Sequence, residues 1–255
     1  MDKLGHSMKE YESTTTGLRF DRNDVVVARL DGRSFSSFTR DLKKNGTFHE
    51  GFAHAMQNLT NYLIETYNPI IGYVQSDEIS LIFINNEKSD HPFGGRIFKM
   101  QSLMAADASI HFLGLLPRFL PTKIASKPMF DCRVFKVPDR MEAYNCLLWR
   151  RKDGYRNAVS AVARDHFSDK MLHGKHRKEQ LEMLLNKGVN FHTQYDNMYR
   201  FGTFYIRTTE TRAFTTSEIK MLPPKHLARS NPNLQVVRHV VREMEFEHVQ
   251  SHLLS

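Results

Sequence analysis

Residues 70–84 read IIGYVQSDEISLIFI, two apolar runs joined by a short polar turn. Runs of β-branched and aliphatic residues bounded by turn residues are typical of buried β-strands. The pattern therefore predicts a β-hairpin. Its tip is acidic, because Asp77 and Glu78 follow Ser76 between the two runs.

A second acidic step lies earlier in the chain. The apolar run VVVARL at residues 25–30 predicts another buried strand, and Asp31 and Gly32 follow it directly. Residues 52–63 carry apolar side chains at helical spacing, and Asn68-Pro69 ends the predicted helix. Both acidic steps thus lie where a strand ends.

The order of the predicted elements gives the fold class. A second helix is predicted at about residues 93–115 and a further strand at 130–137. The resulting order, βαββαβ, is that of the ferredoxin-like fold. We therefore expect an α+β protein with a ferredoxin-like core of the polymerase-palm type, in which the first strand and the hairpin lie side by side.

The pattern changes after residue 137. Longer helices are predicted at residues 142–166 and 175–186, followed by a strand at 201–207. Pro223-Pro224 breaks the chain before a predicted final helix with one apolar face, made of Val236, Val237, Val240, Val241 and Met244. We expect residues 1–137 to form a palm-type catalytic core, and residues 138–255 to form a helical extension that completes the same compact unit.

Composition narrows the class of partner. The chain has 255 residues, 40% of them hydrophobic, and a net charge of +8, which favours an anionic partner such as a nucleic acid or a nucleotide. Only two cysteines are present, without metal-ligand spacing, which argues against disulfides and a structural zinc site. The N-terminus lacks the apolar stretch of a signal peptide and no run reaches membrane-spanning length, so we expect a cytoplasmic protein with no membrane partner.

The acidic steps predict a chemistry. Asp31, Asp77 and Glu78 would converge at one end of the sheet, where their mutual repulsion favours a bound divalent cation such as magnesium. Two such ions can activate an attacking hydroxyl and stabilise a leaving pyrophosphate. Taken singly, each acidic step can also be a plain turn or a solvated hairpin tip. Taken together, with Arg33, Lys43 and Lys44 nearby, they favour metal-dependent phosphoryl transfer.

The same stretches resemble a known family. The segments RLDGRSF at residues 29–35 and YVQSDEIS at residues 73–80 are similar to the two acidic motifs of the tRNA(His) guanylyltransferase family. Shorter matches are Met8 to Glu12, Phe130 to Val134, Trp149-Arg150 followed by Asp153, and Met198-Tyr199-Arg200. The resemblance runs from about Met8 to Arg207. It implies an enzyme that activates a 5′-monophosphate with ATP, or uses a 5′-triphosphate, and then adds nucleotides to the 5′ end of a tRNA in the 3′-to-5′ direction, by attack of the 3′-hydroxyl of an incoming GTP.

The resemblance also implies a set of site residues. Asp31, the Gly32 carbonyl and Asp77 would hold two magnesium ions, with Glu78 beside them. The triphosphate would be bound by side chains and backbone from two segments: Gly32, Arg33, Ser34, Phe35, Ser36, Lys44 and Ser76. The family forms homotetramers, as dimers of dimers, and the resemblance implies the same assembly here.

One motif departs from the eukaryotic branch of the family. Where that branch carries His-Ile-Asn-Asn-x-Tyr-Asn, residues 155–161 read YRNAVSA and keep only the first asparagine. The chain is therefore more similar to the branch that repairs tRNA 5′ ends by templated addition, while addition of G-1 to tRNA(His) is the other interpretation. Predicted RNA contacts are Arg133, Arg150, Arg151, Lys152, Arg156, Asn157 and Arg200.

Two other functions share these features. A nucleotide cyclase or cyclic-dinucleotide synthase can be built on the same palm, and it would release a cyclic product from nucleotide alone. A non-catalytic tRNA-binding protein would bind RNA equally well after Asp31→Ala or Asp77→Ala. Trp149 could stack on a base, although a lone Trp at an apolar helix position is more often a core residue.

Overall fold

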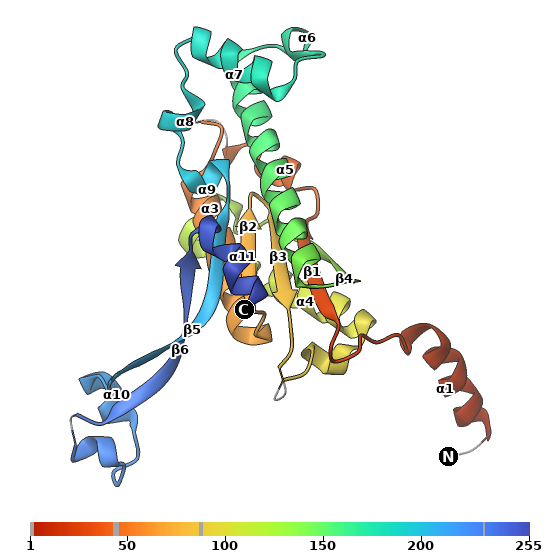
Figure 1. Cartoon of the computed structure of the whole chain (residues 1–255), viewed down its shortest axis with the longest axis vertical. Helices are drawn as coiled ribbons and strands as arrows, with labels where there is room; N and C mark the ends of the chain where they lie inside the picture. Colours follow the sequence, from red (N-terminus) through yellow and green to blue (C-terminus); the bar gives the residue numbers. More distant parts are fainter. Residues whose placement is uncertain (1–2, 43–45, 87–88, 232) are drawn as a thin grey trace.

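The computed structural model describes residues 3–42, 46–86, 89–231 and 233–255. These residues contain a six-stranded antiparallel sheet (Figure 1). The strand order is β4-β1-β3-β2-β5-β6. The first four strands are in the ferredoxin-like order, which confirms the predicted βαββαβ core. Their bounds are β1 Val25–Gly32, β2 Ile71–Gln75, β3 Glu78–Phe83 and β4 Phe130–Val137.

Helices cover both faces of this sheet. On one face, α3 (Glu50–Tyr67) and α4 (Ile97–Phe119) pack against every second residue of β1, so that Val26, Ala28 and Leu30 share a core with both helices. On the other face, α5 (Arg140–His166) and α11 (Phe246–Leu254) cover the alternate residues Val25 and Val27. Side chains alternate along a strand, so the apolar strands predicted from sequence serve both cores.

Helix α5 is longer than the sheet it covers. Its second half carries a third apolar cluster together with shorter helices beyond the sheet, at the top of Figure 1. These are α6 (Asp169–Leu172), α7 (Arg177–Asn186) and α8 (Phe191–Gln194), after which α9 (Asn197–Arg200) returns the chain to the sheet. The predicted helices at 142–166 and 175–186 are confirmed to within a few residues.

The prediction of a final helix that includes residues 236–244 is wrong. These residues form β6 (Gln235–Met244), which pairs along its whole length with β5 (Thr203–Ala213), while a helix, α11, begins only at Phe246. Only Thr203 to Tyr205 of β5 also pair with β2, so the rest of the β5–β6 ribbon leaves the sheet as an arm that carries α10 (Thr216–Met221) (Figure 1). The valines recur at a spacing that fits a helix, but β-branched residues favour a strand once a partner strand is available.

Two helices at the N-terminal end complete the fold. Helix α1 (Lys3–Thr16) stands away from the sheet, and α2 (Phe35–Phe38) is a single turn directly after the first acidic step (Figure 1). Within the described ranges, no helix has the length and apolar character needed to cross a membrane.

Candidate active site

The two acidic steps meet at one end of the sheet. Asp31 on β1 lies opposite Glu78 on β3, and the backbone N–H of Gly32 donates to the carbonyl of Asp77 over 3.1 Å. On its other side Asp31 lies opposite Asp131 of β4, so three carboxylates form a row across neighbouring strands. The predicted convergence of Asp31, Asp77 and Glu78 is therefore confirmed. Asp131 was not predicted to join this group, and it does so because the register between β1 and β4 places it opposite Asp31.

A tight turn fixes the position of one acidic step, and close packing fixes the position of the other. Ser76 and Asp77 form the two-residue link between β2 and β3, and Ser76 has a φ of +54°, a left-handed conformation that is unusual for a non-glycine residue. Gly32 is constrained by packing instead. A Cβ atom at this position would lie only 2.5 Å from the ring of Phe35, which is 2% exposed and packs among four other phenylalanines.

Gly32→Ala should therefore destabilise the protein by about 1–3 kcal/mol, the usual cost of forcing extra volume into a packed core. Gly114→Ala is the matched control, because Gly114 lies on α4 with nothing within 4 Å of an added Cβ, and alanine favours a helix. Urea unfolding of both variants measures the difference. A Gly32→Ala midpoint equal to that of the wild-type protein would contradict the packing argument.

Glu78 does not stand free in the acidic row. Arg150 of α5 donates from Nε to Oε1 of Glu78 over 2.5 Å and from Nη2 to Oε2 over 2.6 Å. The side chains are 14% and 15% exposed, and Asp153 lies 3.3 Å from Nη1 of the same arginine. Gly154 lets α5 approach the sheet here, because a Cβ on it would lie 2.6 Å from Gln75. This bidentate pair ties α5 to the hairpin tip.

Burial is the largest influence on the pKa values of Asp31 and Glu78. It raises the pKa of Asp31, and the nearby negative charge of Asp131 raises it further, although three arginines act in the opposite direction. Burial also raises the pKa of Glu78, and the hydrogen bonds from Arg150 offset this effect only in part. A site that disfavours charged carboxyls in this way favours a cation beside them.

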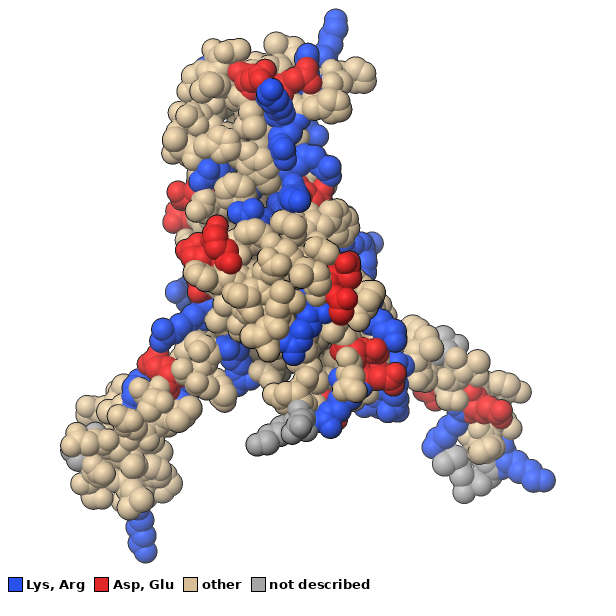
Figure 2. Space-filling model, in the orientation of Figure 1, with Lys and Arg blue, Asp and Glu red and all other residues tan. Residues whose placement is uncertain are grey.

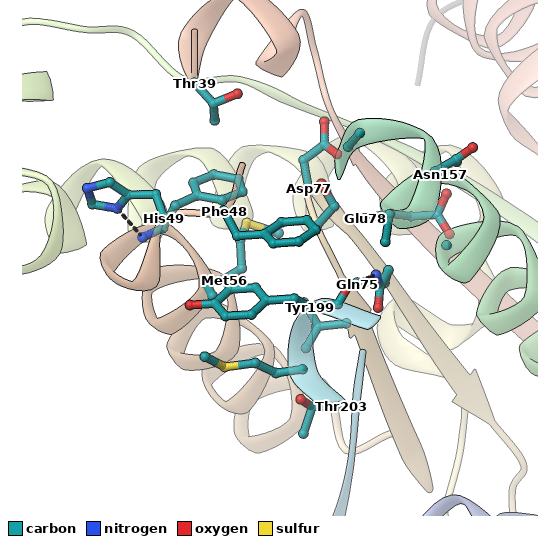
Figure 3. A pocket seen from close by; sticks show the side chains of 18 of the residues that line it. Thr39, Phe48, His49, Met56, Gln75, Asp77, Glu78, Asn157, Tyr199 and Thr203 are labelled. Carbon is teal, nitrogen blue, oxygen red and sulfur yellow. Dashed lines mark hydrogen bonds between the residues drawn. The ribbon is translucent and has the colours of Figure 1, made fainter. Parts of the chain in front are cut away.

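A pocket of about 370 Å³ opens beside the acidic row (Figure 3). Asp31, Asp77, Glu78 and Ser76 line its acidic part. The stacked rings of Phe48 and Tyr199, with centroids 4.9 Å apart, are part of a mainly apolar wall. Other members of this wall are Phe52, Ala53, Met56, Val74, Ala158, Ala161 and Met198. An apolar cavity with polar groups at one end fits a nucleobase whose phosphates point to that end.

Of the predicted nucleotide contacts, Ser76 lines this pocket, whereas residues 32–36 are not part of its described lining. Arg33, Ser34 and Ser36 are exposed on the turn before and within α2, whereas the buried Phe35 side chain packs in the core and leaves only its backbone for a ligand. Lys44, also predicted to contact the triphosphate, lies outside the described residues.

The predicted RNA contacts are not all alike. Basic side chains lie along the face that α5 forms (Figure 2), where Lys152 and Arg156 are exposed. Asn157 lines the pocket, and Arg133 is 55% exposed beside Asp131. Others have protein partners: Arg156 pairs with Asp153, Arg151 packs on the rings of Phe201 and Phe246, and Arg200 donates to Asn197. Arg150 is held by the acidic row, so its RNA contact stays a prediction.

Sequence patterns did not reveal the apolar wall. Its residues come from the segment before α3, from α3 itself, from β2, from α5 and from α9, and the tertiary fold brings them together. Gln75 makes part of this arrangement, because its side-chain amide donates to the carbonyl of Tyr199 over 2.9 Å. The segment Met198-Tyr199-Arg200, singled out by the family resemblance, was the one signal that pointed to this wall.

The donor set at the acidic row suits magnesium. Among the described residues there is no group of three or more His, Cys, Asp or Glu side chains arranged to hold a metal ion. Magnesium does not need one, since it is commonly bound through one or two carboxylates together with substrate phosphates and water. Asp31 and Asp77 line one pocket, and the Gly32–Asp77 backbone bond keeps their strand ends together.

Known proteins are similar in sequence to this chain. The uncharacterized protein R259 of Acanthamoeba polyphaga mimivirus is 30% identical over 207 residues, which are 72% of this chain and 70% of that protein. The tRNA(His) guanylyltransferase 1 of Arabidopsis thaliana is 24% identical over 192 residues, 71% of this chain but only 33% of the plant protein.

Solved structures share the fold. A bacterial tRNA(His) guanylyltransferase-like protein in complex with ATP matches with a TM-score of 0.73 and 26% identity, over 81% of this chain and 87% of that one. Another such bacterial protein, in complex with GTP, matches with a TM-score of 0.72 and 21% identity, over 99% of both chains. The family model described as tRNAHis guanylyltransferase matches residues 5–138, from α1 to the end of β4. Since that match spans more than half of the chain, this protein belongs to the tRNAHis guanylyltransferase family of nucleotidyltransferases.

Proposed function

We propose that this protein adds nucleotides to the 5′ end of a tRNA in the 3′-to-5′ direction, with a nucleoside triphosphate bound in the pocket beside Asp31 and Asp77. The observation that carries the proposal is the pocket itself, which has carboxylates at one end and an apolar wall for a base at the other. Similar proteins solved in complex with ATP and with GTP support a nucleoside triphosphate as the ligand.

Magnesium is part of this proposal. The carboxylates of Asp31 and Asp77 and the carbonyl of Gly32 would hold two ions. These ions would activate the attacking group and compensate the charge of the leaving group, which is pyrophosphate when the 5′-phosphate attacks ATP and AMP when the 3′-hydroxyl of GTP attacks the activated 5′-phosphate. Glu78 has a different task in this chain. Arg150 donates two hydrogen bonds to the Glu78 carboxylate. Glu78 therefore holds in place the hairpin tip that carries Asp77.

The RNA substrate we favour is a tRNA that lacks its first nucleotide. The segment at residues 155–161 departs from the eukaryotic branch, and its Asn157 lines the pocket. Repair by templated addition is therefore the first interpretation, and addition of G-1 to an intact tRNA(His) is the second. Assembly as a homotetramer stays a prediction.

The test uses tRNA(His) with a labelled 5′-phosphate, either complete or lacking its first nucleotide, with magnesium, ATP and GTP. Addition at the 5′ end makes the label internal, so it should become resistant to phosphatase, whereas addition at the 3′ end leaves it sensitive. We expect resistant label on the truncated tRNA, and loss of the reaction when EDTA removes magnesium.

Asp31→Asn protein is the matched control for a contaminating activity. A lengthened RNA whose label stays sensitive to phosphatase would overturn the proposed direction. A cyclic nucleotide formed without RNA would place the protein among the cyclases instead.

A further inference from the structure

Trp149 is not a core residue, although it lies on the helix that covers the sheet. Its side chain is 54% exposed, and it is the only tryptophan in the sequence. Neighbouring positions on α5 behave as expected, since Leu147 is fully buried against the sheet. The exposed ring lies on a helix that also lines the pocket, and a wide aromatic surface of this kind can stack on a ligand.

Two arginines lie beside this ring, and a third lies opposite one of them in the sheet. The guanidinium of Arg150 lies 4.6 Å from the ring centroid, and that of Arg29 lies 5.9 Å from it. Arg133 is opposite Arg29 in the β1–β4 register, with a side chain that is 55% exposed. Its contact with Asp131 is an exposed pair at 3.5 Å, which a phosphate can replace at little cost.

The strand register and the pocket lining locate Trp149 and Arg29 relative to Asp31. Arg29 precedes Asp31 by two residues on β1, so both side chains lie on the same face of the sheet. Asp31 lines the nucleotide pocket, whereas the described lining of that pocket does not include Trp149. The open indole therefore lies outside the pocket, next to the strand that carries Asp31.

We propose that Trp149, with Arg29 and Arg133, forms a stacking platform for the base at the 5′ end of the RNA substrate. The proposal rests on the proposed function, because it places the RNA end and the nucleoside triphosphate on two sides of Asp31. Unpaired RNA bases are commonly bound by stacking on aromatic rings while arginines contact the phosphates. Arg29 beside the ring and the exposed Arg133 opposite Arg29 in the strand register give the platform a positive charge that favours RNA over a neutral partner.

The lone tryptophan gives a direct readout. The full-length protein is titrated, without nucleoside triphosphate, with an RNA hairpin that has a one-nucleotide 5′-adenosine overhang, and with the same hairpin carrying an abasic overhang. We expect the first to quench tryptophan fluorescence strongly and the second to quench it little. The abasic hairpin should also bind about tenfold more weakly, as expected for one stacked base.

Two variants separate stacking from simple packing. Trp149→Ala should weaken binding of the adenosine hairpin about tenfold, and Trp149→Phe should restore most of the affinity. Tyr11→Ala is the matched control, because Tyr11 is also exposed, at 70%, but lies on the remote helix α1. Equal quenching by both hairpins, or unchanged affinity in Trp149→Ala, would overturn the platform.

The two proposals fail in different ways. If the adenosine hairpin quenches Trp149 but no RNA is ever extended, the platform holds and the proposed function is wrong. If RNA is extended at its 5′ end but neither hairpin quenches the fluorescence, the platform is wrong and the proposed function stands.

Discussion

Asp31→Asn should lower the rate of nucleotide addition by about a thousandfold, equivalent to about 4 kcal/mol of transition-state stabilisation. The amide keeps the shape of the side chain but removes the negative charge that would hold a magnesium ion. Stability should not fall, because burial and the charge of Asp131 both raise the pKa of Asp31 and thus oppose its ionised form. Single-turnover extension of labelled tRNA measures the rate, and urea unfolding measures the stability.

Asp24→Asn is the control for this variant. Asp24 lies just before β1, at the end opposite Asp31, and pairs with Lys136 over 3.2 Å. Its substitution also removes one negative charge from the same region of chain, but it should leave the rate within a few-fold of the wild-type rate. A similar loss of rate in both variants would show that β1 is disturbed as a whole, and a near-normal rate in Asp31→Asn would contradict the metal-ligand role.

Arg150→Met should destabilise the protein by about 3–5 kcal/mol, the range found when one partner of a buried ion pair is removed. Glu78 would then be left without its bidentate partner, with its side chain only 15% exposed. Because Glu78 lies in the hairpin tip next to Asp77, activity should fall together with stability. Urea unfolding gives the free-energy change.

Arg156, an exposed arginine on the same helix as Arg150, provides the matched control. Arg156 pairs with Asp153 on the same helix, but its side chain is 65% exposed, so Arg156→Met should cost less than about 1 kcal/mol. The double variant Arg150→Met, Glu78→Gln should recover much of the lost stability, since the unpaired buried charge is gone. Equal costs for Arg150→Met and Arg156→Met would contradict a special role of the Arg150–Glu78 pair.

The sequence by itself determined the palm and its acidic end. Apolar runs of four to six residues bounded by turns predict buried strands because such segments can bury both faces, and Asp31, Asp77 and Glu78 are placed by the same local pattern. The strand at residues 130–137 was predicted with the bounds that the structure has. These features depend on residues that are close together in the sequence, so the sequence alone is enough to predict them.

Only the tertiary structure decided the rest, because it depends on neighbours across the chain. The valines of β6 form a strand only because β5 is available for pairing along its whole length. Arg150 reaches Glu78 from 72 residues away, and strand register brings Asp131 beside Asp31. Trp149 looked like a core residue by its spacing and is open to solvent instead. Each of these outcomes depends on which elements pack together, and periodicity along a single segment carries no information about that choice.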